Sequence, residues 1–245
     1  MSRAPSARIH PTAVISPEAE LADDVVVGPF AVIEGAVKIG PGCVLRPYVH
    51  LCGPLTMGAG NLVYSGAVLG ERPQHMKYND EPTSTEIGDH NIFREHVTVH
   101  RGTTQSWATR IGSHNFFMAH SHVAHDCQLG SRVVMANGAL LGGHCTIQDG
   151  VFISGNAALH QFCIVGRLAM LSGGSINTKD VPPFAIQQGI NAIMGVNVVG
   201  MRRAGLANDQ INAVRQAYRM LFHTDDLLSV AAERVANELG MVDAV

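Results

Sequence analysis

The chain has 245 residues, of which 46% are hydrophobic and 15% are charged, and its formal net charge is -3. This composition disfavours disorder, and the small negative charge gives no reason to expect nucleic-acid binding. No apolar run reaches the ~18 residues that a membrane span needs, and the first ten residues lack the apolar segment of a signal peptide. We therefore expect a cytoplasmic protein in a reducing compartment, with its cysteines present as free thiols.

A six-residue period runs through the chain from residue 9 to residue 176. Its leading position is Ile, Leu, Val, Met or Phe at every step, namely Ile9, Ile15, Leu21 and each sixth residue to Leu69, then Ile87, Phe93 and Val99, then each sixth residue from Ile111 to Leu171. This period fits neither a helix nor a simple alternating strand. Hexapeptide repeats are typical of a parallel β-helix, in which three repeats form one coil and residues 18 apart stack roughly 4.8 Å apart.

A second register lies four residues later and holds mostly small side chains, which should also point inward. It contains four of the cysteines, Cys43, Cys127, Cys145 and Cys163. We predict that these are buried packing residues. A Cys/His zinc site is disfavoured for them, because inward thiols point away from outward histidines.

The period breaks twice, at about 70–86 and at about 104–110. We interpret these segments as loops expelled from the prism. The first carries His75 and Lys77, and loops on a rigid scaffold are where binding residues concentrate.

The repeat ends after Asn177, and Asp180–Phe184 reads as a breaker. A helical period begins near Leu206, with Asn208 as a plausible N-cap, and Thr224 can cap a second helix that ends at Gly240. These patterns predict a β-helix domain over 1–190 and a helical domain over 191–245.

Three histidines, His120, His122 and His125, fall within six residues in the middle of the repeat. Coil arithmetic stacks Gly143 and Gln161 on His125. A base beside the unshielded N–H of a glycine fits general-base attack on a carbonyl with stabilisation of the oxyanion. A metal site and a purely structural set of histidines are the alternatives.

Neighbouring positions extend the same column. Asp126 stacks under His144, and His160 lies beside Gln161. No outward Ser or Cys is placed beside His125, which favours direct transfer to the hydroxyl of an acceptor over a covalent intermediate.

The sequence resembles the UDP-N-acetylglucosamine O-acyltransferases that begin lipid A synthesis, in motifs at Lys77-Tyr78, Thr98–Thr103, His122–Cys127, Gly143-His144, His160–Phe162 and Asp180–Pro183. The resemblance implies an all-β fold, a left-handed parallel β-helix, followed by a small helical domain. It also implies a homotrimer with active sites between subunits. The reaction would move a 3-hydroxyacyl chain from the phosphopantetheine of acyl carrier protein to the 3-hydroxyl of UDP-N-acetylglucosamine, without a cofactor or metal.

The same resemblance assigns roles to residues. His125 would be the general base, Asp126 would orient it, and the Gly143 N–H would bind the oxyanion. Substrate-binding positions would be His75, Lys77, His122, His144, His160, Gln161, Gly173 as the ruler of acyl length, and Asn197 and Arg203 for the nucleotide.

Three positions depart from the family pattern. His75 stands where the family usually has Asp, Val199 replaces an acidic residue, and Ala204 replaces a basic one. Two alternatives follow, a paralogue that N-acylates a 3-amino UDP-sugar or uses another acceptor, and a non-catalytic binding trimer.

Overall fold

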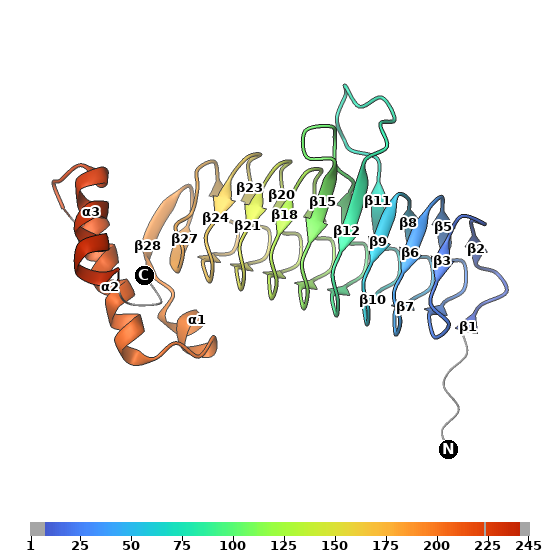
Figure 1. The fold of residues 1–245 in the computed structure, drawn as a ribbon, viewed down its shortest axis with the longest axis horizontal. Coiled ribbons are helices and arrows are strands. Elements are labelled where there is room, and N and C mark those ends of the chain that lie inside the picture. Colours follow the sequence, from blue (N-terminus) through green and yellow to red (C-terminus); the bar gives the residue numbers. More distant parts are fainter. Residues whose placement is uncertain (1–7, 223, 241–245) are drawn as a thin grey trace, which may run out of the picture.

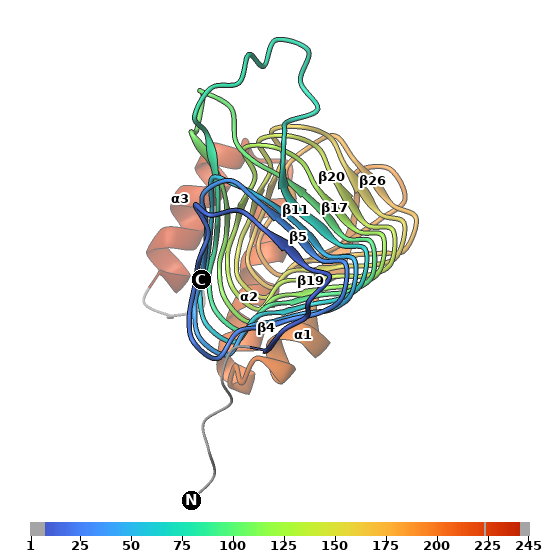
Figure 2. The ribbon, with the colours of Figure 1, turned by 90° about the vertical axis from the view of Figure 1, so that its right-hand side faces the viewer.

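The computed structural model describes residues 8–222 and 224–240. Short strands joined by turns wind into a long prism with a triangular cross-section (Figures 1 and 2). The outermost residues of the two predicted domains, 1–7 and 241–245, lie outside the described residues.

Three sheets form the sides of the prism. The first sheet contains β1 (Arg8–Ile9), β4 (Val26–Val27), β7 (Val44–Leu45), β10 (Leu62–Val63), β13 (Ile92–Phe93), β16 (Phe116–Phe117), β19 (Val134–Met135), β22 (Phe152–Ile153), β25 (Met170–Leu171), β27 (Ala185–Gln188) and β28 (Ala192–Val196). The second contains β2 (Val14–Ile15), β5 (Val32–Glu34), β8 (His50–Cys52), β11 (Val68–Glu71), β14 (Thr98–His100), β17 (His122–Val123), β20 (Leu140–Leu141), β23 (Ala158–Leu159) and β26 (Ile176–Asn177). The third contains β3 (Glu20–Leu21), β6 (Val37–Ile39), β9 (Leu55–Met57), β12 (Ser84–Ile87), β15 (Ala108–Ile111), β18 (Gln128–Leu129), β21 (Thr146–Ile147) and β24 (Ile164–Val165).

The strands within each sheet pair in parallel, one coil on the next. Leu45 pairs with Val63 and Phe117 pairs with Met135, so regular coils have the predicted spacing of 18 residues. This register confirms the parallel β-helix.

The leading position of the repeat fills the core. From Val27 to Leu171 these residues are all buried, whereas Ile9 in the first described coil is 47% exposed because no coil covers it from below. Phe93 and Phe117 stack with their ring centroids 4.8 Å apart. The four cysteines of the second register are buried free thiols, as predicted.

The two expelled loops project from the same corner of the prism (Figure 2). They are narrower than predicted, spanning 72–83 between β11 and β12 and 101–107 between β14 and β15. The flanking strands β11, β12 and β15 extend into the segments that lack the repeat, because strand pairing continues there without the six-residue pattern.

The C-terminal part closes one end of the prism (Figure 1). β28 pairs antiparallel with β27, so the first sheet continues past residue 190. Three helices follow, α1 (Val198–Arg203), α2 (Asn208–Phe222) and α3 (Leu228–Leu239). The helices and the prism share a small apolar core that includes Phe184, Met201, Ile211 and Val214.

Helix ends differ from the predicted caps. Asn208 is the first residue of α2, and α3 begins after Leu227. The Thr224 hydroxyl instead accepts a hydrogen bond from the Asp226 N–H. The helix α1 was not predicted, because six residues are too few to show a period. None of the helices within the described ranges is both long and apolar enough to cross a membrane.

Candidate active site

The corner that carries both loops also carries the turn after β17, which presents His125 and Asp126. Asp126 takes a left-handed backbone conformation with φ of 63°, which turns the chain sharply at the corner. The next coil places Gly143 and His144 at the equivalent positions, with the His144 N–H donating to the carbonyl of His125. The six-residue period thus sets which side chains meet here.

Asp126 is held by the second loop. The Thr103 N–H donates to Oδ1 and the Thr103 hydroxyl donates to Oδ2, each at 2.8 Å. The Ser106 hydroxyl also donates to Oδ1. The Asp126 N–H donates to the Thr109 hydroxyl at 2.8 Å. Loop 101–107 therefore positions this carboxylate, a role that the six-residue pattern did not reveal.

The carboxylate of Asp126 is ionised although it is only 2% exposed. Burial by itself would raise its pKa, but the hydrogen bonds from His125, Ser106 and Thr103 together lower that pKa well below its usual range. An ionised carboxylate can only accept hydrogen bonds.

The charge on Asp126 sets the tautomer of His125. His125 Nδ1 lies 2.7 Å from Asp126 Oδ2. Since that oxygen can only accept, Nδ1 carries the proton and Nε2 is left with a free lone pair. This is the arrangement of a general base that an acidic neighbour orients.

Gly143 lies directly against the His125 ring. A Cβ at this position would be 2.7 Å from Cε1 and 2.9 Å from Nε2 of His125. Within the described residues the Gly143 N–H donates to no backbone carbonyl. The free N–H and the free Nε2 therefore face the same small space.

We expect Gly143→Ala to lower kcat by about 10²–10³-fold, because the new methyl group displaces the His125 ring and covers the N–H donor. Gly155→Ala is the matched control, since a Cβ there lies 3.4 Å from its nearest neighbour, the carbonyl oxygen of Asn137. Steady-state kinetics of both variants checks this expectation. Equal activity of the two variants would contradict the placement of Gly143 in the site.

Other rings surround His125. His144 packs edge-on against it, with Nε2 3.5 Å from Asp126 Oδ2, and stacks on Phe162 at a centroid distance of 4.5 Å. Burial lowers the pKa of His144, so it is neutral at pH 7. His75 reaches the same space from loop 72–83, with its ring 5.4 Å from that of His125.

His122 lies one strand before His125. Its Nδ1 is 2.7 Å from the Thr98 hydroxyl, and its ring meets the buried His100 ring edge-on. Burial, together with the nearby His100 and His125, lowers the pKa of His122 to about 4. His122 is therefore neutral at pH 7 and can donate or accept one hydrogen bond to a substrate.

This lowered pKa predicts an acid-sensitive fold. An unfolded chain binds a proton at His122 below its ordinary pKa of 6.5, whereas the folded chain resists protonation down to about 4. Stability is therefore lost as the pH falls from 6.5 to 4. His122→Gln should flatten this slope by up to about 1.4 kcal/mol per pH unit, measured by denaturant unfolding across that range. An unchanged slope in the variant would contradict the assignment.

The remaining predicted positions lie around this centre without printed contacts to His125. Lys77 is exposed in loop 72–83. His160 and Gln161 are exposed one coil beyond Gly143, and Gly173 is exposed further along the prism. These placements leave their substrate-binding roles as predictions.

The two nucleotide positions lie at α1. Asn197 caps this helix by accepting from the Gly200 N–H and donates to the Leu168 carbonyl. Its amide therefore has a structural function in the fold. Arg203 is exposed at the end of α1.

His125, Asp126 and His144 together could offer three ligand atoms to a metal, since these atoms lie within 4.8 Å of one another. However, the Asp126 oxygens already accept bonds from Thr103, Ser106 and His125. A metal would have to break this network, so the geometry favours a base over a chelate.

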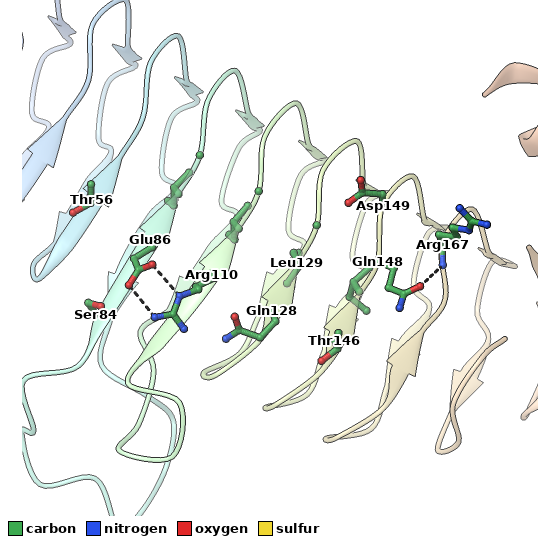
Figure 3. Close-up of a pocket in the computed structure, with 16 residues that line it drawn as sticks. Thr56, Ser84, Glu86, Arg110, Gln128, Leu129, Thr146, Gln148, Asp149 and Arg167 are labelled. Carbon is green, nitrogen blue, oxygen red and sulfur yellow. Dashed lines mark hydrogen bonds and ion pairs between the residues drawn. The ribbon is translucent and has the colours of Figure 1, made fainter. Parts of the chain in front are cut away.

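The largest groove lies elsewhere, on the outer face of the third sheet, with a volume of about 1040 Å³. In Figure 3, Glu86 forms an ion pair with Arg110, and the Gln148 side chain accepts from the Arg167 N–H. None of the predicted site residues lines this groove. It has no arrangement of base and bare N–H, and we do not assign it to the reaction.

Two family models match the chain. The model for domain 2 of UDP-N-acetylglucosamine O-acyltransferases matches residues 180–245, and the bacterial transferase hexapeptide model of six repeats matches residues 108–143. The second model covers the turn that carries His125 and the coil that carries Gly143.

Characterised relatives extend the match to nearly the whole chain. An acyl-[acyl-carrier-protein]–UDP-N-acetylglucosamine O-acyltransferase from Anaeromyxobacter is 46% identical over 97% of this chain and 93% of its own length. Solved structures of LpxA from Acinetobacter baumannii and of the UDP-N-acetylglucosamine O-acyltransferase from Moraxella catarrhalis are 39% and 38% identical. The first covers 94% of this chain and 90% of the solved chain with a TM-score of 0.92, and the second covers 95% and 91% with a TM-score of 0.91.

These similarities also settle the hand of the prism, which is a left-handed parallel β-helix with a small helical C-terminal part, as the resemblance implied. Identity and coverage of this order over both parts leave one family. The chain belongs to the acyl-[acyl-carrier-protein]–UDP-N-acetylglucosamine O-acyltransferases.

Proposed function

We propose that this protein transfers a 3-hydroxyacyl chain from acyl carrier protein to the 3-hydroxyl of UDP-N-acetylglucosamine, the first step of lipid A biosynthesis. The observation that carries the proposal is the hydrogen-bonded pair of Asp126 and His125 beside the bare N–H of Gly143. Family membership supplies the substrates. The acyl group arrives as a thioester on the phosphopantetheine arm, so the chain needs no cofactor of its own.

The reaction proceeds in two proton transfers. His125 Nε2 takes the proton of the sugar 3-hydroxyl while that oxygen attacks the thioester carbonyl carbon. The carbonyl oxygen becomes an oxyanion, which the Gly143 N–H stabilises. The intermediate collapses, the C–S bond breaks, and the protonated His125 returns its proton to the departing thiolate. Asp126 stabilises the imidazolium throughout.

This route needs no enzyme nucleophile. Among the described residues, the hydroxyls nearest to the pair belong to Thr103 and Ser106, and both donate to Asp126 rather than to His125. Direct transfer therefore fits the site better than a covalent acyl-enzyme.

Neighbouring residues would bind the substrates. We propose that His75, Lys77, His122, His144, His160 and Gln161 contact the sugar and acyl groups, and that Asn197 and Arg203 contact the nucleotide. Because the Asn197 amide is already engaged in capping α1, its part in nucleotide binding would be through the shape of that helix end.

We also propose a homotrimer with active sites between subunits. Outward apolar side chains support association, since Ile92 and Phe152 on the first sheet and Leu140 and Ile176 on the second remain exposed on the single chain. Analytical ultracentrifugation should give three times 26.1 kDa. A cytoplasmic location stays a prediction.

Gly173 offers a test of acyl-length selection. A Cβ at this position would lie 3.6 Å from the Gly155 carbonyl oxygen, its nearest neighbour, so a longer side chain finds room. We expect Gly173→Met to disfavour long donors, by roughly fourfold in kcat/KM per displaced methylene, about 0.8 kcal/mol each. A series of hydroxyacyl carrier proteins of increasing chain length measures this. An unchanged length preference would remove Gly173 from the acyl site.

One competition assay separates the possible acceptors. The protein is given a hydroxyacyl carrier protein with equal amounts of UDP-N-acetylglucosamine and its 3-amino analogue. Mild alkali then distinguishes esters, which it cleaves, from amides, which survive. We expect mainly ester. Predominant amide would indicate that the departures at His75 and Val199 mark an N-acyltransferase, and binding without product would indicate a non-catalytic trimer.

A further inference from the structure

A second cluster of chemically active side chains lies outside the reaction site, at the base of loop 72–83. His50 and Cys52 are two residues apart on β8, so both point outward from the second sheet. Glu34 on β5 lies in register with Cys52. Glu71 joins them from β11, where the pairing register shifts between Leu69 and Glu71. Three consecutive coils therefore bring four potential metal ligands to one point.

The distances between these ligand atoms match a tetrahedral site. His50 Nε2 lies 3.4 Å from Glu34 Oε2 and 3.4 Å from Cys52 Sγ. Cys52 Sγ lies 3.6 Å from Glu71 Oε2. Ligand atoms that surround Zn²⁺ tetrahedrally at ~2.0–2.3 Å are separated by roughly 3.3–3.6 Å. The cluster thus has the spacing of a metal site.

We propose that Glu34, His50, Cys52 and Glu71 bind one Zn²⁺ ion per chain. A thiolate with one imidazole and two carboxylates suits Zn²⁺, whereas Mg²⁺ and Ca²⁺ prefer oxygen ligands alone. The earlier argument against a Cys/His site concerned thiols that point into the core. Cys52 is the one cysteine that lies outside that inward register, and its side chain shares the outer face with His50.

The surroundings favour a cation. A cavity of about 350 Å³ at this point is lined by Glu34, Cys52 and Glu71 together with loop residues such as Tyr78 and Glu81. Cys52 is only 4% exposed. Burial, and then the negative charge of Glu71, raises the pKa of the Cys52 thiol to about 12, so the metal-free thiol is protonated.

Binding therefore releases a proton. The S–H bond of Cys52 breaks, the sulfur forms a bond to Zn²⁺, and the proton passes to the buffer. Three anionic ligands around Zn²⁺ leave one excess negative charge. Arg101 can offset this charge, since its guanidinium lines the same cavity and donates to the Gly70 carbonyl.

The ion would join β5, β8 and β11 at the point where loop 72–83 leaves the prism. That loop carries His75 and Lys77 toward the reaction site. The metal would therefore have a structural effect on the loop, with no part in the proton transfers at His125.

Cobalt titration tests the proposal. The full chain, without an affinity tag, is reduced, stripped with a chelator and titrated with Co²⁺. We expect a thiolate-to-cobalt charge-transfer band in the near ultraviolet that saturates at one ion per chain and disappears when Zn²⁺ is added. His125→Ala is the control, because the cluster of His125, Asp126 and His144 contains no thiol. That variant should keep the band.

Two further variants identify the ligands. Cys52→Ser should abolish the band, and His50→Gln, which keeps the thiol, should weaken Co²⁺ binding by about tenfold or more. Zn²⁺ should raise the melting temperature of the unaltered chain more than that of His50→Gln. No band at millimolar Co²⁺, a band that survives in Cys52→Ser, or equal Co²⁺ affinity in His50→Gln would each overturn the site.

Discussion

His125→Ala should lower kcat/KM by about 10²–10⁴-fold, the usual contribution of a positioned general base. The imidazole is the only group in the site with a free lone pair directed at the space beside Gly143. Without it the sugar hydroxyl must lose its proton to water. Initial rates with hydroxyacyl carrier protein and UDP-N-acetylglucosamine measure the change.

The fold should survive this substitution, because the His125 ring rests on the outer surface of the coil rather than in the apolar core. Circular dichroism and sedimentation of the variant provide the control. His120→Ala is a matched comparison, since His120 lies in the same histidine segment but stacks on the exposed His96, away from the site. Comparable losses in both variants would argue for a general defect rather than a missing base.

Asp126→Asn should have the second largest effect, again about 10²–10⁴-fold in kcat. The amide can donate a hydrogen bond to His125 Nδ1, which shifts the ring proton to Nε2 and removes the lone pair that accepts the sugar proton. The amide also lacks the charge that stabilises the imidazolium. KM should change little, because Asp126 is buried beneath His125 and away from the substrates.

Thr103→Val is the matched variant for this prediction. It removes the hydroxyl bond to Asp126 Oδ2 but leaves the Thr103 N–H bond to Oδ1. We expect a loss of about tenfold in kcat, since one of several bonds to the carboxylate is lost. If Asp126→Asn kept full activity while Thr103→Val lost it, the orienting role would belong to the loop and not to the carboxylate.

Much of the fold follows from the sequence because the core is periodic. Each coil repeats the same inward positions, so Leu45, Val63 and Met135 could be placed in the core by counting. The loop boundaries could not, because β12 and β15 pair over four residues without the hexapeptide pattern. The short helix α1 depends on the Asn197 cap and on contacts with the end of the prism, which local sequence does not encode.

The stacked part of the site was predictable for the same reason. His125, Gly143 and His144 lie in the turns of successive regular coils, and the structure brings them together. Thr103 and Ser106 were missed because they lie in the expelled loop, where counting by 18 fails. The register Val99 to Val123, which is 24 residues, would have placed the segment around Gly102 beside Asp126.

The cluster around Cys52 was missed for a related reason. Glu34 and Cys52 are 18 residues apart and could have been aligned by counting. Glu71 could not, because the register shift next to Gly70 moves it into line. Irregular backbone places a fourth ligand where the repeat predicts none.

The most direct test of this account is the mass of the product. The purified protein and its His125→Ala variant are each incubated with a 3-hydroxyacyl carrier protein and UDP-N-acetylglucosamine, and the nucleotide products are resolved by mass spectrometry. The account predicts that the unaltered protein adds one hydroxyacyl group in alkali-labile linkage, at a rate about 10²–10⁴ times that of the variant. An unaltered protein that forms no acylated nucleotide, or a variant as fast as the unaltered protein, would contradict it.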